Sequence, residues 1–238
     1  MAHRLGLEDR KSPMNPRTST PYVFRTLAAA LLGVGLCVGW FSGASATTSS
    51  SPVKEIIATG QTSWQAVVAD LTGPVDGVYY QKHMAQHLIP PLPRAWIASL
   101  TNVILIRDPV DVVASYVRSR AEVTDNDIGL IQQADLFDQL GGAAPVIDAA
   151  DFLQDPERYT RWMCAYAGVD FTEAMLAWPA GPRASDGVWA PHWYDSVLAS
   201  TGFQPARRRE IELSPESLAV AERNRPQYSR LHAARVVL

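Results

Sequence analysis

The segment from Val103 to Tyr116, with the sequence VILIRDPVDVVASY, constrains the fold of this chain more than any other. Its first four residues, Val103–Ile106, are apolar and typical of a parallel strand buried on both faces. Asp108 and Pro109 suit the cap and the first turn of a helix, where the missing N–H of proline costs nothing. An amphipathic helix is then indicated by apolar residues at helical spacing: Val110, Val113, Ala114 and Val117.

This strand, turn and helix would bring two anion-binding side chains together. Arg107 directly follows the strand, and open α/β folds bind their ligands at the carboxyl ends of parallel strands. Ser115 lies eight residues later, where its hydroxyl can reach the same anion. Arginine donates bidentate hydrogen bonds to phosphate, although pairing with Asp108 or Asp111 would also explain an arginine at a helix start. The pattern favours a phosphate site made by Arg107 and Ser115.

The same residues resemble a known signature, Arg-Asp-Pro-x-Asp-x-x-x-Ser-Tyr. It is the 3′-phosphate signature of sulfotransferases that use 3′-phosphoadenosine-5′-phosphosulfate (PAPS). Upstream, the stretch Lys82–Pro90 (KHMAQHLIP) is similar to the Lys-x-His-Leu-Pro region of that superfamily. The resemblance extends over roughly residues 62–203 and is nearest to bacterial and plant members whose substrates are largely unassigned.

The resemblance implies a role for each of these residues. His83 matches the catalytic base of the family, and histidine suits this role because its pKa lies near the working pH. Lys82 would neutralise charge on the bridging oxygen or lie at the surface. If the predicted strand runs from Val78 through both residues, the pleat sends them to opposite faces, and His83 is then the one that faces PAPS. Arg107 and Ser115 would hold the 3′-phosphate.

The amino-terminal segment, residues 1–52, differs from the rest of the chain. No acidic residue occurs between Asp9 and Glu55, and basic residues precede an apolar run over residues 27–41. This layout is typical of a secretory signal or an organelle transit peptide. The run is shorter than the ~20 apolar residues that a membrane span needs, so membrane association is expected only if this run is a real anchor.

A competing interpretation of the same segment comes from the family. The stretch Asn15-Pro-Arg-Thr-Ser-Thr20 resembles the loop that binds the 5′-phosphosulfate, with one residue missing. The resemblance assigns binding of the 5′-phosphosulfate to backbone amides and to the side chains of Arg17, Thr18, Ser19 and Thr20. In the family this loop follows an apolar strand and precedes a helix, but residues 8–13 are not strand-like and Pro21 follows at once. We hypothesise that an insertion, a fusion or a shifted reading frame has altered this quarter of the chain.

Composition limits the remaining classes of function. The chain has 238 residues, 47% hydrophobic and 19% charged, which is enough for one α/β domain, expected over residues 53–238. A net charge of −3 gives no overall attraction for nucleic acid. The two cysteines form no disulfide framework, His83 and His87 lack a third ligand for a metal, and no Walker loop is present.

Further elements are expected along residues 53–238. We predict helices over residues 62–71, 95–100, 125–140, 155–168, 171–178 and 215–234, strands over 78–83 and 145–148, and a loop or lid over 181–204. Trp189, His192 and Trp193 in that loop are candidates for the walls of an acceptor pocket. The order predicts an α/β fold with a central parallel sheet flanked by helices. The resemblance to sulfotransferases further implies a three-layer architecture like that of P-loop nucleoside-triphosphate hydrolases and kinases.

The expected function is sulfuryl transfer from PAPS to a hydroxyl or amine of a small molecule or glycan, with no metal. A catalytically impaired descendant that binds a nucleotide or a partner is a second hypothesis, and phosphoryl transfer from ATP is a third. Because PAPS is made inside cells, a cytoplasmic location is expected. Secretion, a membrane anchor or an organelle is the alternative, and the sequence leaves the oligomeric state open.

Overall fold

The computed structural model describes residues 24–27, 61, 63–88, 90, 92–118, 122–182, 195–205 and 212–238. Among these residues, every pair of neighbouring named strands is parallel. Strand β1 (Phe24–Leu27) lies between β2 (Val78–Gln81) and β3 (Thr101–Asn102), and β4 (Ile104–Ile106) pairs with β5 (Val146–Asp148). Only Val103 separates β3 from β4, so one extended segment connects the two sheets.

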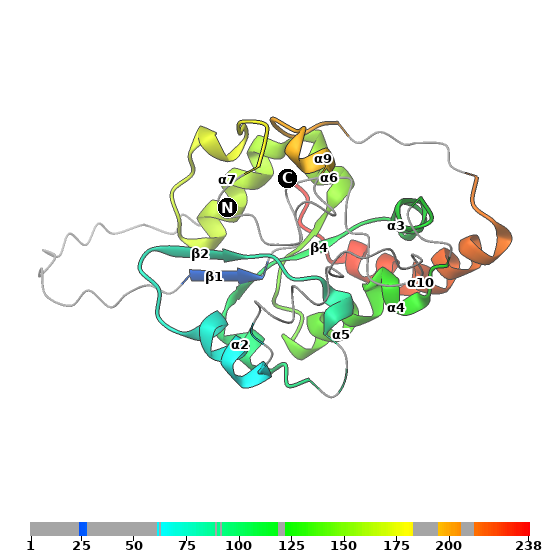
Figure 1. Cartoon of the computed structure of the whole chain (residues 1–238), viewed down its shortest axis with the longest axis horizontal. Helices are drawn as coiled ribbons and strands as arrows, with labels where there is room; N and C mark the ends of the chain where they lie inside the picture. Colours follow the sequence, from blue (N-terminus) through cyan, green and yellow to red (C-terminus); the bar gives the residue numbers. More distant parts are fainter. Residues whose placement is uncertain are drawn as a thin grey trace, which may run out of the picture.

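Helices cover both faces of these strands, which gives the three layers that the sequence predicts (Figure 1). Below the strands in this view lie α2 (Trp64–Thr72), α4 (Asp125–Ile128), α5 (Leu130–Gln139) and α10 (Pro215–Ala233). Above them lie α6 (Ala149–Gln154), α7 (Pro156–Ala167) and α9 (Asp195–Leu198). The remaining elements are α3 (Pro109–Tyr116) and three 3₁₀ turns, η1 (Ala85–His87), η2 (Ala95–Ser99) and η3 (Glu173–Met175).

The alternation of side chains along the strands explains why both faces are covered. Ile104 and Ile106 belong to the core cluster that contains residues of α4, α5 and α10. Val103 lies in the cluster with residues of α6 and α7, and Leu105 packs against that second cluster. Successive residues of a strand point to opposite faces, so an apolar run of this kind needs a hydrophobic layer on each side.

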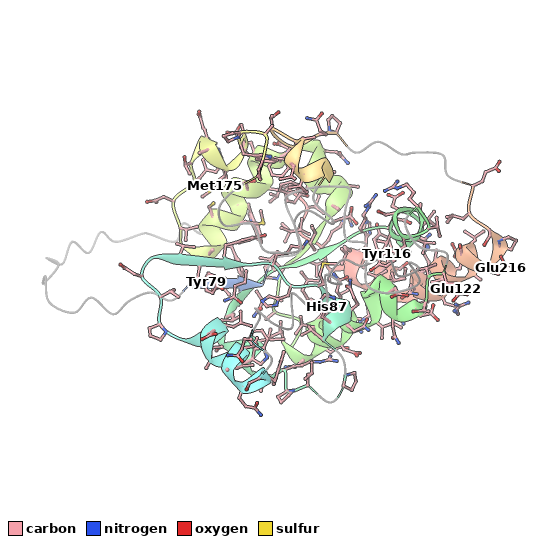
Figure 2. All side chains as sticks on the ribbon, in the orientation of Figure 1. Tyr79, His87, Tyr116, Glu122, Met175 and Glu216 are labelled. Carbon is pink, nitrogen blue, oxygen red and sulfur yellow. The ribbon has the colours of Figure 1, made fainter. Side chains whose placement is uncertain are left out.

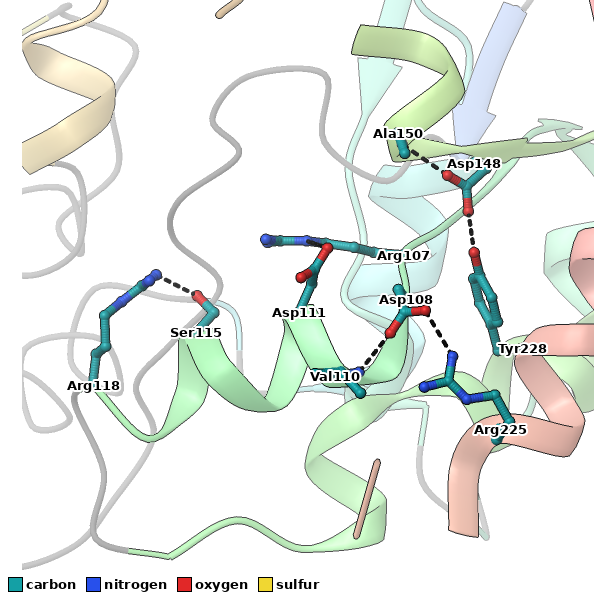
Figure 3. Close-up of polar contacts among 10 residues, drawn as sticks. All are labelled: Arg107, Asp108, Val110, Asp111, Ser115, Arg118, Asp148, Ala150, Arg225 and Tyr228. Atoms are coloured by element: carbon teal, nitrogen blue, oxygen red, sulfur yellow. Dashed lines mark hydrogen bonds and ion pairs between the residues drawn. The ribbon is translucent and has the colours of Figure 1, made fainter. Parts of the chain in front are cut away.

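The turn between β4 and α3 has the predicted geometry. The Asp108 carboxylate accepts a hydrogen bond from the Val110 amide at 2.8 Å, and Pro109 occupies the first turn of α3. On its other oxygen, Asp108 accepts a hydrogen bond from the Arg225 guanidinium of α10 at 2.7 Å (Figure 3). The start of α3 is therefore fixed both by its own cap and by the last long helix.

A second turn, between β5 and α6, repeats this construction. Asp148 ends β5 and caps α6 by accepting a hydrogen bond from the Ala150 amide at 2.8 Å. The Tyr228 hydroxyl of α10 donates to the other oxygen of Asp148 at 2.9 Å. Asp148 is buried, and its negative charge is one reason why the pKa of Tyr228 is raised, after burial of the phenol itself.

Several predicted elements have different limits in the structure. The strand predicted through His83 ends at Gln81, whose register partner Leu27 is the last residue of β1, so the argument about opposite faces does not apply to Lys82 and His83. The helix predicted over 125–140 is broken at Gly129, which has a left-handed φ of 76°. Over 171–178 only the short turn η3 forms, while Ala177 forms an isolated bridge with Gly202.

The amino-terminal segment contributes to the sheet. Strand β1 lies within residues 1–52, so at least this part of the segment pairs with strands of the predicted 53–238 domain. The boundary at residue 52 stays a prediction, and the rest of the 27–41 run lies outside the described residues. Among the helices that the structure describes, none combines the length and the hydropathy needed to cross a membrane.

Candidate functional site

Arg107 lies at the carboxyl end of β4, where the sequence predicts it. Its Nε atom is 4.0 Å from Asp111 Oδ2, and the two side chains are 32% and 43% exposed. The pairing with Asp111 that the sequence left open is therefore present. An ion pair of this length at a partly exposed position contributes little, and the five N–H donors of a guanidinium exceed what one carboxylate accepts. A guanidinium can therefore donate to more than one acceptor at once, which is the chemistry that a phosphate site needs.

Ser115 lies two turns further along α3 and has a charged neighbour that the sequence analysis missed. Its side chain is buried, and its Oγ accepts a hydrogen bond from Arg118 Nη2 at 3.0 Å. Because this bond uses a lone pair of the hydroxyl, the hydroxyl hydrogen remains available to donate to another acceptor. Arg118 follows Arg107 by eleven residues, about three helical turns, which is the signal that could have revealed it.

These side chains lie along one side of α3 (Figure 3). In that view the order along the helix is Arg107, Asp111, Ser115 and Arg118. The surface carries two guanidinium groups, one hydroxyl and one carboxylate, so its net charge is positive. We call this set of four residues the α3 anion face.

His83 lies beyond the end of β2 in a partly buried position. Its Nε2 is 3.0 Å from Gln81 Oε1, and its ring meets Trp96 edge to face with centroids 5.8 Å apart. Burial lowers the pKa of His83, and the positive charge of His87 lowers it further. His83 is therefore neutral near pH 7, as a general base must be. Lys82 is exposed beside it.

The histidine segment contacts helix α3 through η1. Gln86 of η1 donates a hydrogen bond from Nε2 to the Tyr116 hydroxyl at 3.2 Å, and Tyr116 follows Ser115 directly. Gly129 permits this approach, because a Cβ there would lie 3.2 Å from Gln86 Oε1. In Figure 2, His87 at the end of η1 and Tyr116 at the end of α3 are both labelled on the right-hand half of the molecule. The break between α4 and α5 thus lets η1 approach α3.

Other predicted site residues are not among the described residues. These are the four candidates for the 5′-phosphosulfate, Arg17, Thr18, Ser19 and Thr20, and the three acceptor-pocket candidates, Trp189, His192 and Trp193. Strand β1 begins at Phe24, four residues after Thr20. In the part of the chain that the structure describes, no group of three or more His, Cys, Asp or Glu side chains is placed to hold a metal ion.

Comparison with known proteins gives a family and two curated relatives. The family model described as "Sulfotransferase domain" matches residues 39–226, most of the chain. The chain is 32% identical over 157 residues to branched-chain-amino-acid aminotransferase-like protein 1 of Arabidopsis thaliana, and 30% identical over 159 residues to protein 2 of the same name. Each alignment covers 65% of this chain but only 28% of the relative, so the chain spans little more than a quarter of these proteins.

Two solved structures are also similar to the chain. The sulfotransferase domain of the curacin biosynthetic pathway aligns with a TM-score of 0.44 and 16% identity, over 67% of this chain and 65% of that one. The sulfotransferase domain of the Synechococcus PCC 7002 olefin synthase aligns with a TM-score of 0.37 and 15% identity, over 67% and 62% of the two chains.

Proposed function

The chain belongs to the sulfotransferase domain family, and we propose that it transfers a sulfuryl group from PAPS to a hydroxyl or amine of a small-molecule or glycan acceptor. The observation that carries this proposal is the α3 anion face, on a helix that the segment of a neutral histidine contacts through η1. In this proposal the protein acts in the cytoplasm, where PAPS is made, and needs no metal.

The α3 anion face would bind the 3′-phosphate of PAPS. Arg107 donates from one end of the face, and Ser115 donates the hydroxyl hydrogen that Arg118 leaves available. Ser115 is buried and already held by Arg118, so little side-chain freedom is lost when an anion binds. A hydrogen bond to a charged group contributes about 1.5–3 kcal/mol, so each of these donors affects affinity measurably.

His83 would be the general base of the transfer. PAPS supplies an activated sulfuryl group; the acceptor oxygen forms a new bond to sulfur while the bond from sulfur to the bridging phosphate oxygen breaks. His83 takes the proton from the attacking hydroxyl, and its lowered pKa keeps it able to do so near pH 7. Lys82 would compensate the charge on the bridging oxygen. The remaining acceleration comes from positioning and charge stabilisation. In the same proposal, Arg17, Thr18, Ser19 and Thr20 bind the 5′-phosphosulfate.

The test is transfer of labelled sulfate from PAPS to a panel of alcohols, amines and oligosaccharides. We expect transfer by the native chain, its loss in H83N, and a Kd for adenosine 3′,5′-bisphosphate raised at least about tenfold in R107Q. R161Q is the matched control, because Arg161 is an exposed arginine that pairs with Glu157 on α7. Equal effects of R107Q and R161Q would contradict the assignment of the 3′-phosphate site.

A second candidate function is a catalytically impaired protein that binds the nucleotide or a partner. The sequence feature in its favour is Pro21 directly after the Asn15–Thr20 loop, where the family places a helix. Adenosine 3′,5′-bisphosphate would then raise the melting temperature while no acceptor receives sulfate. Stabilisation by ATP in preference to the 3′-phosphorylated nucleotide would instead support phosphoryl transfer from ATP.

A further inference from the structure

Gln81 is a buried polar residue at the end of an exposed strand. Along β2, the apolar side chains of Val78, Tyr79 and Tyr80 are 60%, 40% and 50% exposed, whereas Gln81 is only 5% exposed. This reverses the usual preference, because burying an amide is costly unless its hydrogen bonds are made. The Gln81 amide makes hydrogen bonds at both of its ends, to Leu71 and to His83, and these contacts explain its burial.

The two contacts of Gln81 fix the orientation of its amide group. Nε2 donates a hydrogen bond to the Leu71 carbonyl oxygen of α2 at 3.0 Å. A carbonyl oxygen only accepts, so the NH₂ end of the amide faces Leu71 and the oxygen end faces His83. Gln81 Oε1 is 3.0 Å from His83 Nε2. Since an amide oxygen also only accepts, the neutral imidazole must carry its hydrogen on Nε2.

We propose that Gln81 is a positioning residue that selects the Nε2–H tautomer of His83 and so makes Nδ1 the atom that accepts the proton of the acceptor hydroxyl. The part concerning the base rests on the proposed function, whereas the tautomer is a property of the native chain. Trp96 packs against the same ring, which limits its rotation away from Gln81. The backbone of α2 thereby determines which imidazole nitrogen has the lone pair.

The choice of an amide instead of a carboxylate has a chemical consequence. A carboxylate partner would orient the imidazole equally well, but its negative charge would raise the pKa of His83. Gln81 orients the ring without adding charge. The charged groups that act on the two histidines are themselves cationic: His87 acts on His83, and Lys82 acts on His87. The neutral form of His83 is therefore favoured by burial and, to a smaller extent, by the nearby His87.

Two variants of Gln81 separate orientation of the histidine from support of α2. Q81E keeps an oxygen acceptor for His83 Nε2 but cannot donate to the Leu71 carbonyl when ionised. Q81M removes both contacts at nearly constant length. If Gln81 only supports α2, the two variants will change His83 alike. If Gln81 selects the tautomer, Q81E will keep the Nε2–H form and Q81M will lose it.

The experiment is ¹⁵N NMR of histidine-labelled protein near pH 8, with H83N used to assign the His83 signals. We expect a protonated-type Nε2 signal and an unprotonated-type Nδ1 signal in the native chain and in Q81E, and averaged signals in Q81M. Nδ1–H in the native chain would overturn the inference whether or not the protein transfers sulfate. Because the NMR measurement needs no acceptor substrate, it tests the tautomer separately from the proposed function.

Kinetics give a second readout once an acceptor is known. We expect Q81M to lower kcat by about 10- to 100-fold, part of the 10²–10⁴ that general-base catalysis supplies, with little change in KM. Q81E should retain more of kcat than Q81M and move the acid limb of the pH–rate profile upward. Q154M on α6 is the control for a glutamine-to-methionine change at an exposed position. An unmoved pH profile in Q81E would contradict direct contact between this side chain and the base.

Discussion

The hydrogen bond between Arg118 and Ser115 leads to a quantitative prediction about anion binding. If Arg118 acts mainly by orienting the Ser115 hydroxyl, the two residues must show a coupling free energy in a double-mutant cycle. The variants are S115A, R118Q and the pair together, and the ligand is adenosine 3′,5′-bisphosphate. Ser115 is buried and Arg118 is exposed, so the two single changes differ in expected size.

The magnitudes follow from the contacts. S115A removes a buried donor to a charged group, about 1.5–3 kcal/mol, which corresponds to about a 10- to 150-fold rise in Kd. R118Q removes an exposed charge, for which about 1 kcal/mol, or about fivefold, is expected. Once Ser115 is absent, Arg118 has no hydroxyl to orient. We therefore expect a coupling of about 1 kcal/mol, within the range found for residues in direct contact.

Titration calorimetry at one fixed salt concentration measures these affinities. Adenosine 5′-monophosphate, which lacks the 3′-phosphate, is the control ligand, and its affinity should change little in all three variants. R161Q again controls for the loss of an exposed arginine. Effects that add within about 0.3–0.5 kcal/mol would refute the orienting role of Arg118. An equal loss for the control ligand would refute the assignment of this face to the 3′-phosphate.

The remaining predictions concern stability and pH. D108A removes a helix cap and the partner of Arg225, so urea unfolding should show a loss of about 1–3 kcal/mol, larger than the loss in D108N, which keeps a cap. L231A opens a cavity at a fully buried position and should cost about 2–5 kcal/mol; under about 1 kcal/mol would contradict that packing. The lowered pKa of His83 puts the acid limb of kcat/KM below 6.5. As pH falls, His83 binds a proton in the unfolded chain before it does so in the folded chain. The free energy of unfolding therefore decreases as pH falls below 6.5.

The part of the fold that could be predicted is the part with local determinants. For β4 and α3 these are an apolar run, a capping aspartate and a proline in the first turn, all within a few residues of one another. The same holds for α10, whose start is fixed by Ser214 and Pro215. Pro226 lies inside α10, where a proline removes a backbone hydrogen bond, yet the helix continues to Ala233 because its buried residues pack against segments far away in the sequence.

Contacts between distant segments account for what sequence reasoning missed. The break at Gly129 is required by the approach of η1, and nothing in the local pattern distinguishes this glycine from a tolerated one within a helix. Gln81 looked like an ordinary strand residue, because its partner in α2 is a backbone carbonyl that has no sequence signature. Arg118 was missed for a local reason, because the signature that contains Arg107 ends at Tyr116, two residues before Arg118.

The position of α10 bears on how the proposed anion site can lie beside an aspartate. Asp108 directly follows Arg107 and would be its nearest competitor for charge. Both carboxylate oxygens of Asp108 are engaged elsewhere, one by the Val110 amide and the other by Arg225, which lies 117 residues away in the sequence. In Figure 3 the Arg225 side chain approaches Asp108 from below and the Arg107 side chain extends away above it. Arg225 compensates the charge of Asp108, and the Nε atom of Arg107 lies 4.0 Å from Asp111 Oδ2, one turn further along the helix. Removing Arg225 should therefore weaken phosphate binding at a face that it does not touch, by allowing Arg107 to pair with Asp108.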